Sequence, residues 1–337
     1  MTAANDGGDF LRSLRERAAA RKRVVVYPEG DDPRILEAAA ACVRQELVAP
    51  MLLGDQDRIR DGLSERGVDP AGVRVSSPDT EAARTRCLAH VRARRAHKND
   101  SEEALYSMAA DPLFQAATMV AEGEADGMVA GCVRTTGDVV RAGLVCVGLA
   151  PGIETLSSSF YMVFEPGHPV GARVLTFTDA GVVPGPSSDQ LAEIAAAAVV
   201  ARARIVGDDP RVAFLSYSTK GSAEGPAVAP VRDALHAFRR KMPDVPADGE
   251  LQADAALDAD VAARKAPGSP VAGQANVLVF PDLSAANIAY KLVQHLGGAV
   301  ALGPVLQGLS RPVNDLSRGA VATDVVAVSC ITALQSG

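Results

Sequence analysis

Short apolar runs rich in β-branched residues alternate with longer amphipathic stretches along most of the chain. A short run of this kind is typical of a buried strand, and apolar residues at helical spacing are typical of a packed helix. We expect strands at residues 23–30, 48–55, 126–133, 157–164, 173–183, 211–219 and 275–282. We expect helices at residues 9–23, 31–47, 80–98, 101–123, 135–147, 187–205, 226–241 and 284–297. The alternation predicts an α/β fold.

The length of 337 residues and this alternation predict two sheet-centred domains, because one domain usually takes about 150 residues. The first strand, helix and strand form a β–α–β unit, which implies a parallel sheet. A boundary near Ala150–Pro151 is expected from the Ala-Pro-Gly signal. Residues 242–274 are rich in Pro, Ala, Gly and Asp, so we expect an exposed excursion that carries part of a site.

Composition narrows the class of protein. The chain has 34 Lys and Arg against 41 Asp and Glu, a net charge of −7, so it lacks the basic footprint of a nucleic-acid binder. Hydrophobic residues make up 47% of the chain, but they form no run of about 18 residues that could span a membrane. The charged N-terminus has no apolar h-region, and five single cysteines indicate a reducing compartment, so we expect a cytoplasmic protein.

Four expected strand ends are unusually polar: residues 28–34, 131–141, 215–225 and 303–319. Ligands of open α/β sheets bind at the carboxyl ends of strands. Glycine lets backbone N–H groups approach a phosphate, and arginine binds phosphate oxygens in a fork, so these ends suit a phosphate-bearing ligand. Each segment taken alone is more often an ordinary turn or helix cap.

Several common chemistries find no support in the residue spacing. The chain has no GxSxG elbow, no GxxxxGK[ST] loop and no GxGxxG fingerprint. Its five histidines lack HxH or HExxH spacing, so no metal site is expected. The segment GLSRPVNDLSRG (residues 308–319) carries two Ser-Arg pairs, and it is either a solvated loop or a loop held at a sheet edge.

From about residue 23 to its end, the chain resembles the phosphate acetyl/butyryl transferase family. The resemblance lies in PEGDDPRILEAA, ADGMVAGCVRTTGDVVR, SSDQLAEIA, RVAFLSYSTKGSAEGP, GELQADAALD, KAPGSPVAGQANVLVFPDLSAANIAYKLVQHLGGA and GPVLQGLSRPVNDLSRG, in the family's order. It implies an acyltransferase of acetate metabolism that interconverts acetyl-CoA plus phosphate with acetyl phosphate plus CoA. It implies no tightly bound cofactor, since CoA is a substrate, and the partners are small molecules and a second copy in a homodimer.

The resemblance also implies an architecture like that of the isocitrate and isopropylmalate dehydrogenases. Two α/β domains would flank a cleft that holds the active site. Because the last segment of such chains returns to the first domain, we expect residues 1–150 plus 305–337 to form one domain. Residues 151–304 would form the other.

The family's catalytic residues match three positions near the C-terminus. Ser317 and Arg318 correspond to its Ser-Arg pair, and Asp324 corresponds to its active-site aspartate. The resemblance implies that Asp324 removes the thiol proton of CoA, while Ser317 and Arg318 bind phosphate and stabilise the developing charge. Without the resemblance, Asp324 would be read as a carboxylate in the first turn of a helix.

Further positions are expected to bind substrate. The resemblance assigns Arg141 and Arg95 to phosphate groups, with Arg94 as the rival of Arg95 because the local match is loose. Hydroxyl or amide groups expected at the ligand are those of Thr135, Thr136, Ser218, Thr219 and Asn314. Asn314 and Asp315 are also expected to organise their loop through side-chain hydrogen bonds.

The chain departs from the family pattern at Val183, Gly185, Asn99 and Arg134, which leaves acyl-chain preference and effector response open. Within the family, a phosphate butyryltransferase is the alternative. A decarboxylating dehydrogenase would need paired metal-binding aspartates, and the pairs available are Asp31 with Asp32 and Asp254 with Asp258. A non-catalytic family member is the third possibility.

Overall fold

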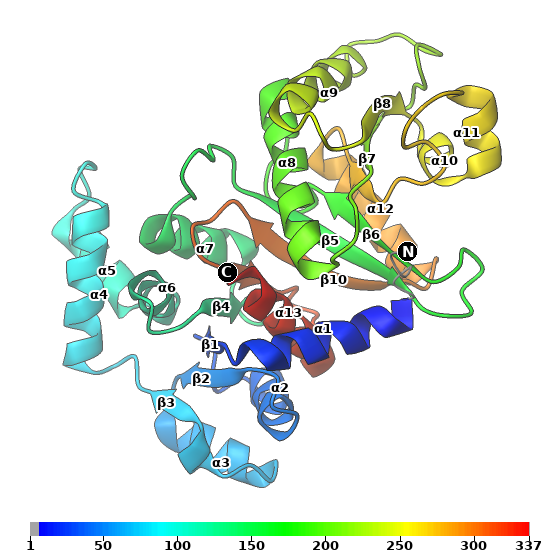
Figure 1. Ribbon diagram of the computed structural model, residues 1–337. Coiled ribbons are helices and arrows are strands. Elements are labelled where there is room, and N and C mark those ends of the chain that lie inside the picture. Colours follow the sequence, from blue (N-terminus) through cyan, green and yellow to red (C-terminus); the bar gives the residue numbers. More distant parts are fainter. Residues whose placement is uncertain (1–6, 337) are drawn as a thin grey trace. The chain divides into compact units, whose positions relative to one another are not determined.

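The computed structural model describes residues 7–336, and the predicted α/β class is confirmed. Residues 12–151 and the segment from residue 309 onward form one compact unit, called here the terminal unit. Residues 152–308, together with the first residues of the N-terminal helix, form a second compact unit, called the central unit. One unit contains a parallel sheet and the other a mixed sheet (Figure 1). The predicted domain boundaries, the dehydrogenase-like architecture and the cleft stay predictions.

The terminal unit is built on a fully parallel sheet with the strand order β11-β4-β1-β2-β3. Its strands are β1 (Val24–Tyr27), β2 (Ala49–Leu53), β3 (Arg74–Ser76), β4 (Gly127–Ala130) and β11 (Val313–Asp315). The first three strands and β4 come from one stretch of chain, whereas β11 comes from the C-terminal segment. The predicted parallel β–α–β unit is confirmed in β1, α2 and β2.

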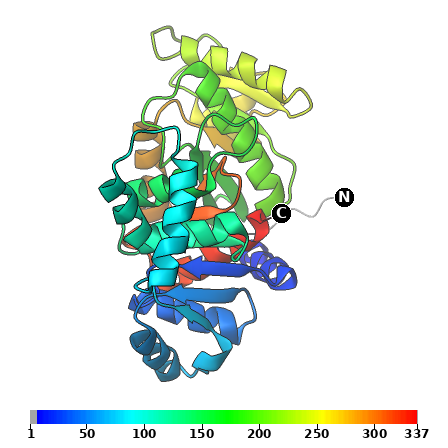
Figure 2. The same cartoon turned by 90° about the vertical axis from the view of Figure 1, so that its left-hand side faces the viewer.

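Helices cover this sheet and connect its strands. They are α1 (Gly7–Arg21), α2 (Pro33–Arg44), α3 (Gln56–Glu65), α4 (Glu81–Arg94), α5 (Glu102–Ala110), α6 (Pro112–Glu122), α7 (Thr136–Ala142) and α13 (Ala322–Gln335), with a short 3₁₀ helix (Pro70–Gly72) and a π-helical turn (Gly143–Val147) that continues α7. The helices α4 and α5 pack side by side (Figure 2). The single helix predicted at 101–123 is two helices, because Asp111 takes an extended conformation before Pro112 and caps α6.

The central unit is built on a mixed sheet with the strand order β10-β5-β6-β9-β7-β8. Its strands are β5 (Ser157–Phe164), β6 (Arg173–Thr178), β7 (Val212–Leu215), β8 (Ala247–Leu251), β9 (Val277–Val279) and β10 (Val300–Gln307). The strand β5 is antiparallel to both β10 and β6, while the remaining pairs are parallel. Its helices are α8 (Ser188–Ile205), α9 (Ala229–Lys241), α10 (Ala253–Leu257), α11 (Ala259–Lys265) and α12 (Leu283–His295).

Two expectations for the central unit were wrong. Residues 242–274 are not simply an exposed excursion, because they contain the fully buried strand β8 and the helices α10 and α11. The strand β8 carries Asp248 and Glu250, and these charges concealed it. Part of the expected polar strand end at 303–319 is the strand β10, whose apolar pattern is interrupted by Gly303 and Pro304.

The core of the central unit includes one fully buried cation. The Arg202 side chain, on α8, is 1% exposed and donates to Asp208 and to the Thr176 hydroxyl. It also donates to the main-chain carbonyls of Val174 and Asn276. Because every direction of the guanidinium fork meets an acceptor, the buried charge is compensated inside the unit.

Candidate active site

Three polar strand ends of the terminal unit leave the same edge of its sheet. The strands β1, β4 and β11 are neighbours and run parallel, so residues 28–34, 131–141 and 316–320 all follow carboxyl ends. They comprise two of the four polar segments that the sequence analysis singled out and the end of a third, residues 303–319. The remaining one, residues 215–225, belongs to the central unit.

The carboxylate of Glu29 fastens the end of β1 to the loop after β4. Its two oxygens accept hydrogen bonds from four consecutive backbone N–H groups, those of Gly131, Cys132, Val133 and Arg134, at 2.8–3.0 Å. A run of N–H groups of this kind forms an anion-binding concavity. Here the buried carboxylate of Glu29 occupies this concavity itself. The loop is therefore held rigidly at the sheet edge.

Arg34, in the first turn of α2, joins all three loops. Its guanidinium donates to both carboxylate oxygens of Asp32, to the carbonyl of Cys132 at 2.8 Å and to the carbonyl of Arg318 at 2.8 Å. It also reaches the carbonyl of Ala320 at 3.4 Å. The Arg34 guanidinium beside Asp32 holds the pKa of that carboxyl below its usual value. The C-terminal loop is therefore attached to the β4 loop through one side chain.

The three residues assigned to catalysis lie in this attached loop and in the helix that follows it. Ser317 and Arg318 are exposed, and the Ser317 hydroxyl accepts from the N–H of Gly319 at 3.2 Å. Asp324 is half-buried at the third position of α13, where its Oδ2 accepts from the N–H of Val321 at 3.0 Å. Asp324 thus has the first-turn position that its alternative interpretation described, which does not exclude a second role for the carboxylate.

The two candidate arginines of the helical layer share an acidic neighbour. Arg95, at the end of α4, forms a two-pronged ion pair with Asp100 at 2.6 and 2.8 Å. Hydrogen bonding to Arg95 lowers the pKa of Asp100, and the charge of Arg141 contributes to the same shift. Arg94, the rival candidate, instead donates to the carbonyls of Val145 and Val147 in the turn after α7. Both side chains therefore have partners inside the terminal unit, and which of the two binds substrate stays a prediction.

The helix α7 begins with two threonines in different surroundings. Thr135 is the N-cap, and its hydroxyl and N–H both donate to Asp138. The Thr136 hydroxyl donates to the Oδ2 of Asp315, 2.6 Å away on β11. The hydroxyl of each threonine is therefore engaged within the terminal unit.

Asn314 and Asp315 point to opposite faces of the short strand β11, as strand geometry requires. Asn314 is fully buried and donates to Thr332 and Gln335 of α13, so its amide serves the packing of that helix. The structure does not bring this amide to the polar strand edge with Ser317. Its substrate-binding role stays a prediction.

In the central unit, Ser218 and Thr219 are buried and hydrogen-bonded to β8 and the residue that follows it. The Ser218 hydroxyl donates to Glu250 at 2.9 Å, and Thr219 exchanges hydrogen bonds with Gln252. Arg232 donates to both oxygens of Glu250, which lowers the pKa of that carboxyl to about 2. Both hydroxyls are satisfied by neighbours inside the unit.

The residues that depart from the family pattern occupy four different environments. Val183 packs against the hydrophobic core beside α8 and α9, whereas Gly185 faces open space. Asn99 is exposed. Arg134 pairs with Asp111 at 2.7 Å, so its charge is engaged between the loop after β4 and the start of α6.

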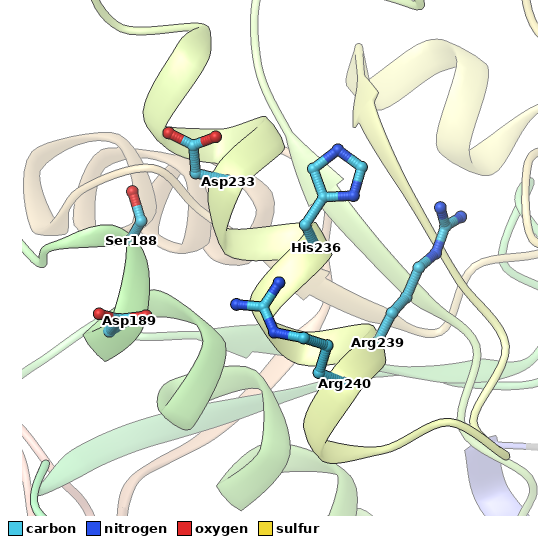
Figure 3. Close-up of a pocket in the computed structure, with 6 residues that line it drawn as sticks. All are labelled: Ser188, Asp189, Asp233, His236, Arg239 and Arg240. Atoms are coloured by element: carbon cyan, nitrogen blue, oxygen red, sulfur yellow. The ribbon is translucent and has the colours of Figure 1, made fainter.

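Two surface hollows have different linings. One of about 330 Å³ lies beside the Glu29 loop and is lined by Pro28, Glu29, Asp31, Asp32, Leu113 and Arg134, among others. A larger one of about 820 Å³ lies in the central unit between the start of α8 and one face of α9. Figure 3 shows its mixed lining of Ser188, Asp189, Asp233, His236, Arg239 and Arg240. None of the predicted site residues is among those six.

Within residues 7–336, no group of three or more His, Cys, Asp or Glu side chains is placed to hold a metal ion. Neither aspartate pair considered for a dehydrogenase supplies such a group: Asp32 is engaged by Arg34, and Asp254 by Lys265. In the same part of the chain, no helix is long and apolar enough to cross a bilayer.

The geometry defines an α/β protein whose arginines and hydroxyls gather at the carboxyl edge of a parallel sheet, as suits a phosphate-bearing ligand. The family model described as "Phosphate acetyl/butaryl transferase" matches residues 9–333. The chain belongs to this family, and the resemblance inferred from its motifs is confirmed.

Known relatives agree with this assignment over nearly the whole chain. A phosphate acetyltransferase from Clostridium acetobutylicum is 40% identical over 97% of this chain and 98% of its own length. One from Paracoccus denitrificans is 42% identical over 97% of this chain and 99% of its own. The crystal structure of a phosphotransacetylase from Streptococcus pyogenes superimposes with a TM-score of 0.90, at 38% identity and 98% coverage of both chains.

Sequence reasoning did not assign a role to Glu29 or Arg34, and it expected side-chain hydrogen bonds from Asp315 without identifying Thr136 as the partner. The first two lie in the motif PEGDDPR, which was noted as a polar strand end, so their position was signalled. Their partners lie about a hundred or more positions away along the chain, and no local pattern identifies them. Only the order of the strands in the sheet brings these groups together.

Proposed function

We propose that the chain catalyses reversible transfer of an acetyl group between CoA and inorganic phosphate. Acetyl-CoA and phosphate would give acetyl phosphate and CoA, which is an acyltransferase reaction. The observation that carries the proposal is about 40% identity with phosphate acetyltransferases along nearly the full length of both chains. The arginine-rich strand edge of the terminal unit supports it.

We propose a direct transfer in which both substrates are bound together. The CoA thiol gives its proton to the Asp324 carboxylate, and the sulfur attacks the carbonyl carbon of acetyl phosphate. The carbon–oxygen bond to phosphate then breaks, and phosphate leaves. A positioned carboxylate helps because a free thiol has a pKa near 8.5. The hydrogen bond from the Val321 N–H to Oδ2 holds the Asp324 carboxyl group in a fixed orientation.

Ser317 and Arg318 are proposed to bind the phosphate group and to stabilise the charge that develops during the attack. Fixed donors of this kind can contribute about 3–4 kcal/mol to a transition state. The attachment of the Arg318 and Ala320 carbonyls to Arg34 supports this role, since it fixes the backbone of the loop while the Arg318 side chain stays exposed.

No covalent acyl-enzyme is required by this scheme. The one cysteine in the matched strand-end motifs, Cys132, is 3% exposed, and burial raises the pKa of its thiol to about 12. A thiol with so high a pKa carries almost no thiolate near neutral pH, so it is a poor nucleophile.

We propose the remaining predicted residues as substrate contacts, although their present hydrogen-bond partners differ. Arg95 and Arg141 would hold phosphate groups of CoA or acetyl phosphate, and both are near Asp100. Thr135, Ser218 and Thr219 already use their hydroxyls internally, so binding through them would require those hydrogen bonds to be exchanged.

We further propose that the two compact units act as two domains and that the protein is a cytoplasmic homodimer of acetate metabolism. Three exposed apolar side chains, Ile288, Leu292 and Leu296, follow at four-residue spacing along α12 and just past its end, which supports a protein contact there. Light scattering of the purified protein, with Leu292→Glu as the disrupting variant, tests the dimer.

The test of the activity is direct. Purified protein would be mixed with acetyl phosphate and CoA, and thioester formation would be followed by absorbance. Butyryl phosphate would run in parallel, because the family description covers both acyl groups. Formation of acetyl-CoA supports the proposal, a preference for butyryl phosphate assigns the chain to the other branch, and no turnover by folded protein contradicts it.

A further inference from the structure

Asp315 is the most deeply buried carboxyl group at the polar strand edge and has no role in the scheme above. It is 0% exposed at the end of β11, one residue before the loop that carries Ser317 and Arg318. Its Oδ2 accepts a hydrogen bond of 2.6 Å from the hydroxyl of Thr136. Thr136 is the first residue of α7. Its Oδ1 has no hydrogen-bond partner among the described residues.

The surroundings of Asp315 leave it little freedom to move. Gly131, on the neighbouring strand end, has no room for a Cβ because Asp315 Oδ1 and the backbone of Leu316 fill that space. The N–H of the same glycine is held by Glu29. Asp315 therefore sits between a fixed loop and α7, at the point where the C-terminal loop begins.

We propose that Asp315 is a positioning residue that holds α7 against the start of the C-terminal loop through its hydrogen bond with Thr136. The helix α7 carries Arg141 in its last turn, and the loop carries Ser317 and Arg318. The contact thereby sets the spacing between two groups of candidate substrate ligands. The inference rests on the proposed function where it concerns catalysis, but the contact itself can be tested without activity.

The charge state of Asp315 follows from what faces it on each side. After the end of β1 it meets the Glu29 carboxylate, from α7 the Thr136 hydroxyl, and from the loop after β4 the Cys132 thiol. The Leu316 N–H, just past the end of β11, also faces it. Burial is the largest cause that raises the pKa of Asp315 to about 7, Glu29 adds to the rise, and the Thr136 hydrogen bond and the nearby Leu316 N–H oppose it. The residue is therefore the neutral acid on the acid side of this value and a buried, uncompensated anion on the alkaline side.

This assigns a direction to the pH dependence of stability at the buried carboxyl group, whereas the Thr136 hydrogen bond by itself favours the ionised form. A raised pKa in the folded state means that the stabilising contribution is present at low pH and is lost as the pH rises through about 7. The loop after β11 should accordingly loosen on the alkaline side, where a buried anion beside Glu29 is favoured by solvent entry.

The first experiment compares three variants by hydrogen exchange of the backbone amides in residues 316–321. Thr136→Val removes the hydroxyl, and Asp315→Asn keeps an acceptor but cannot ionise. Ser329→Ala is the control, because it removes a hydroxyl from another buried pair of the same unit, the one with Tyr27 at 2.7 Å. We expect Thr136→Val to speed exchange of this segment about tenfold and Ser329→Ala to leave it unchanged.

The second experiment follows the pH dependence of the same segment and of turnover. In wild type, loop exchange, corrected for the intrinsic rate, should rise and kcat should fall as the pH passes about 7, with KM changing less. The Asp315→Asn variant should lack that transition in both measurements. An infrared carboxylic-acid band that disappears over the same range in wild type, and is absent in Asp315→Asn, reports the proton directly.

The outcomes separate this inference from the proposed function. Equal loop exchange in Thr136→Val and Ser329→Ala would overturn the positioning role, as would an unchanged pH transition in Asp315→Asn. If Asp315→Asn does not fold, the wild-type infrared band and the Thr136→Val exchange still decide. A protein with no acyl transfer but with these exchange and infrared signals would contradict the proposed function alone.

Discussion

Two buried carboxyl groups, one in each unit, lie at the ends of strands and have opposite electrostatic surroundings. Glu250 on β8 is 2% exposed and receives a two-pronged ion pair from Arg232, a hydroxyl and a backbone N–H, so its pKa is lowered to about 2. Asp315 on β11 is 0% exposed, and its burial, to which the neighbouring Glu29 adds, raises its pKa to about 7 against the opposing effect of the Thr136 hydrogen bond. Burial raises the pKa of both groups, but at Glu250 the Arg232 guanidinium and the other hydrogen-bond donors outweigh it.

The surroundings of β8 and the edge formed by β1, β4 and β11 also differ in how fully their polar side chains are paired. Around β8, Lys220, Arg232 and Arg239 face Asp248 and Glu250, so charges of both signs are paired within the unit. At the edge formed by β1, β4 and β11, the backbone is tightly held, but Ser317 and Arg318 keep exposed side chains. A region with satisfied charges is suited to maintaining the fold, and a rigid backbone with free polar groups is suited to binding.

The largest expected effect is on turnover, from Asp324→Asn. A positioned general base contributes about a hundred- to ten-thousand-fold, so kcat should fall by that order while KM changes only a few-fold. The matched control is Asp260→Asn, an exposed aspartate in the first turn of α11 in the other unit. Steady-state kinetics of acyl transfer make the comparison, and full activity in Asp324→Asn would contradict the base assignment.

Arg318→Ala should follow in size. Loss of a fixed donor to the phosphate should lower kcat/KM about a hundred- to a thousand-fold, without unfolding the protein. Arg311→Ala is a close control, because Arg311 is exposed and belongs to the other Ser-Arg pair of the same segment. If both variants lose activity equally, the segment acts through its overall charge. That result would contradict a specific role of Arg318.

Glu250→Gln tests the frame of the central unit. The variant removes the negative charge to which Arg232 and the Ser218 hydroxyl donate hydrogen bonds. The free energy of unfolding should therefore fall by about 1–3 kcal/mol. We expect no larger loss of stability, because the Arg232 side chain is 40% exposed and solvent screens its charge. Denaturant titration measures it, with Glu165→Gln at an exposed position as the control. A loss of activity with unchanged stability would assign Glu250 to the site instead.

The smallest effect is the pH dependence of stability, which sets the two carboxyl groups against each other. The contribution of Glu250 is present above its unfolded pKa of about 4.3 and is lost as the pH falls towards about 2. The contribution of Asp315 is present at low pH and is lost as the pH rises through about 7. Thermal unfolding across pH should show two separate losses of stability, one towards acid pH and one towards neutral pH. Glu250→Gln should flatten only the acid one and Asp315→Asn only the neutral one.

The strand ends show how far local pattern reaches. The motifs PEGDDPR and GCVRTTGDVVR were recognisable as polar ends of apolar runs, and the structure places both at one sheet edge. The strand β8 was missed because Asp248 and Glu250 break its apolar pattern, although partners from α9 and the loop after β7 make their burial possible. The strand β11 was missed because three residues are too few to show a period.

By itself, the sequence determined the α/β class, the family, the acyl-transfer reaction proposed for it and the motif positions of Ser317, Arg318 and Asp324. These depend on residue identity and local periodicity, which are present in the chain before it folds. The tertiary structure alone decided that Glu29 fills the backbone loop after β4, that Asn314 faces α13 and that Asp315 faces Thr136. The physical reason is that each contact joins strands or helices whose adjacency is fixed by sheet order and packing. Whether a buried carboxyl group carries a charge then depends on neighbours that are distant in sequence.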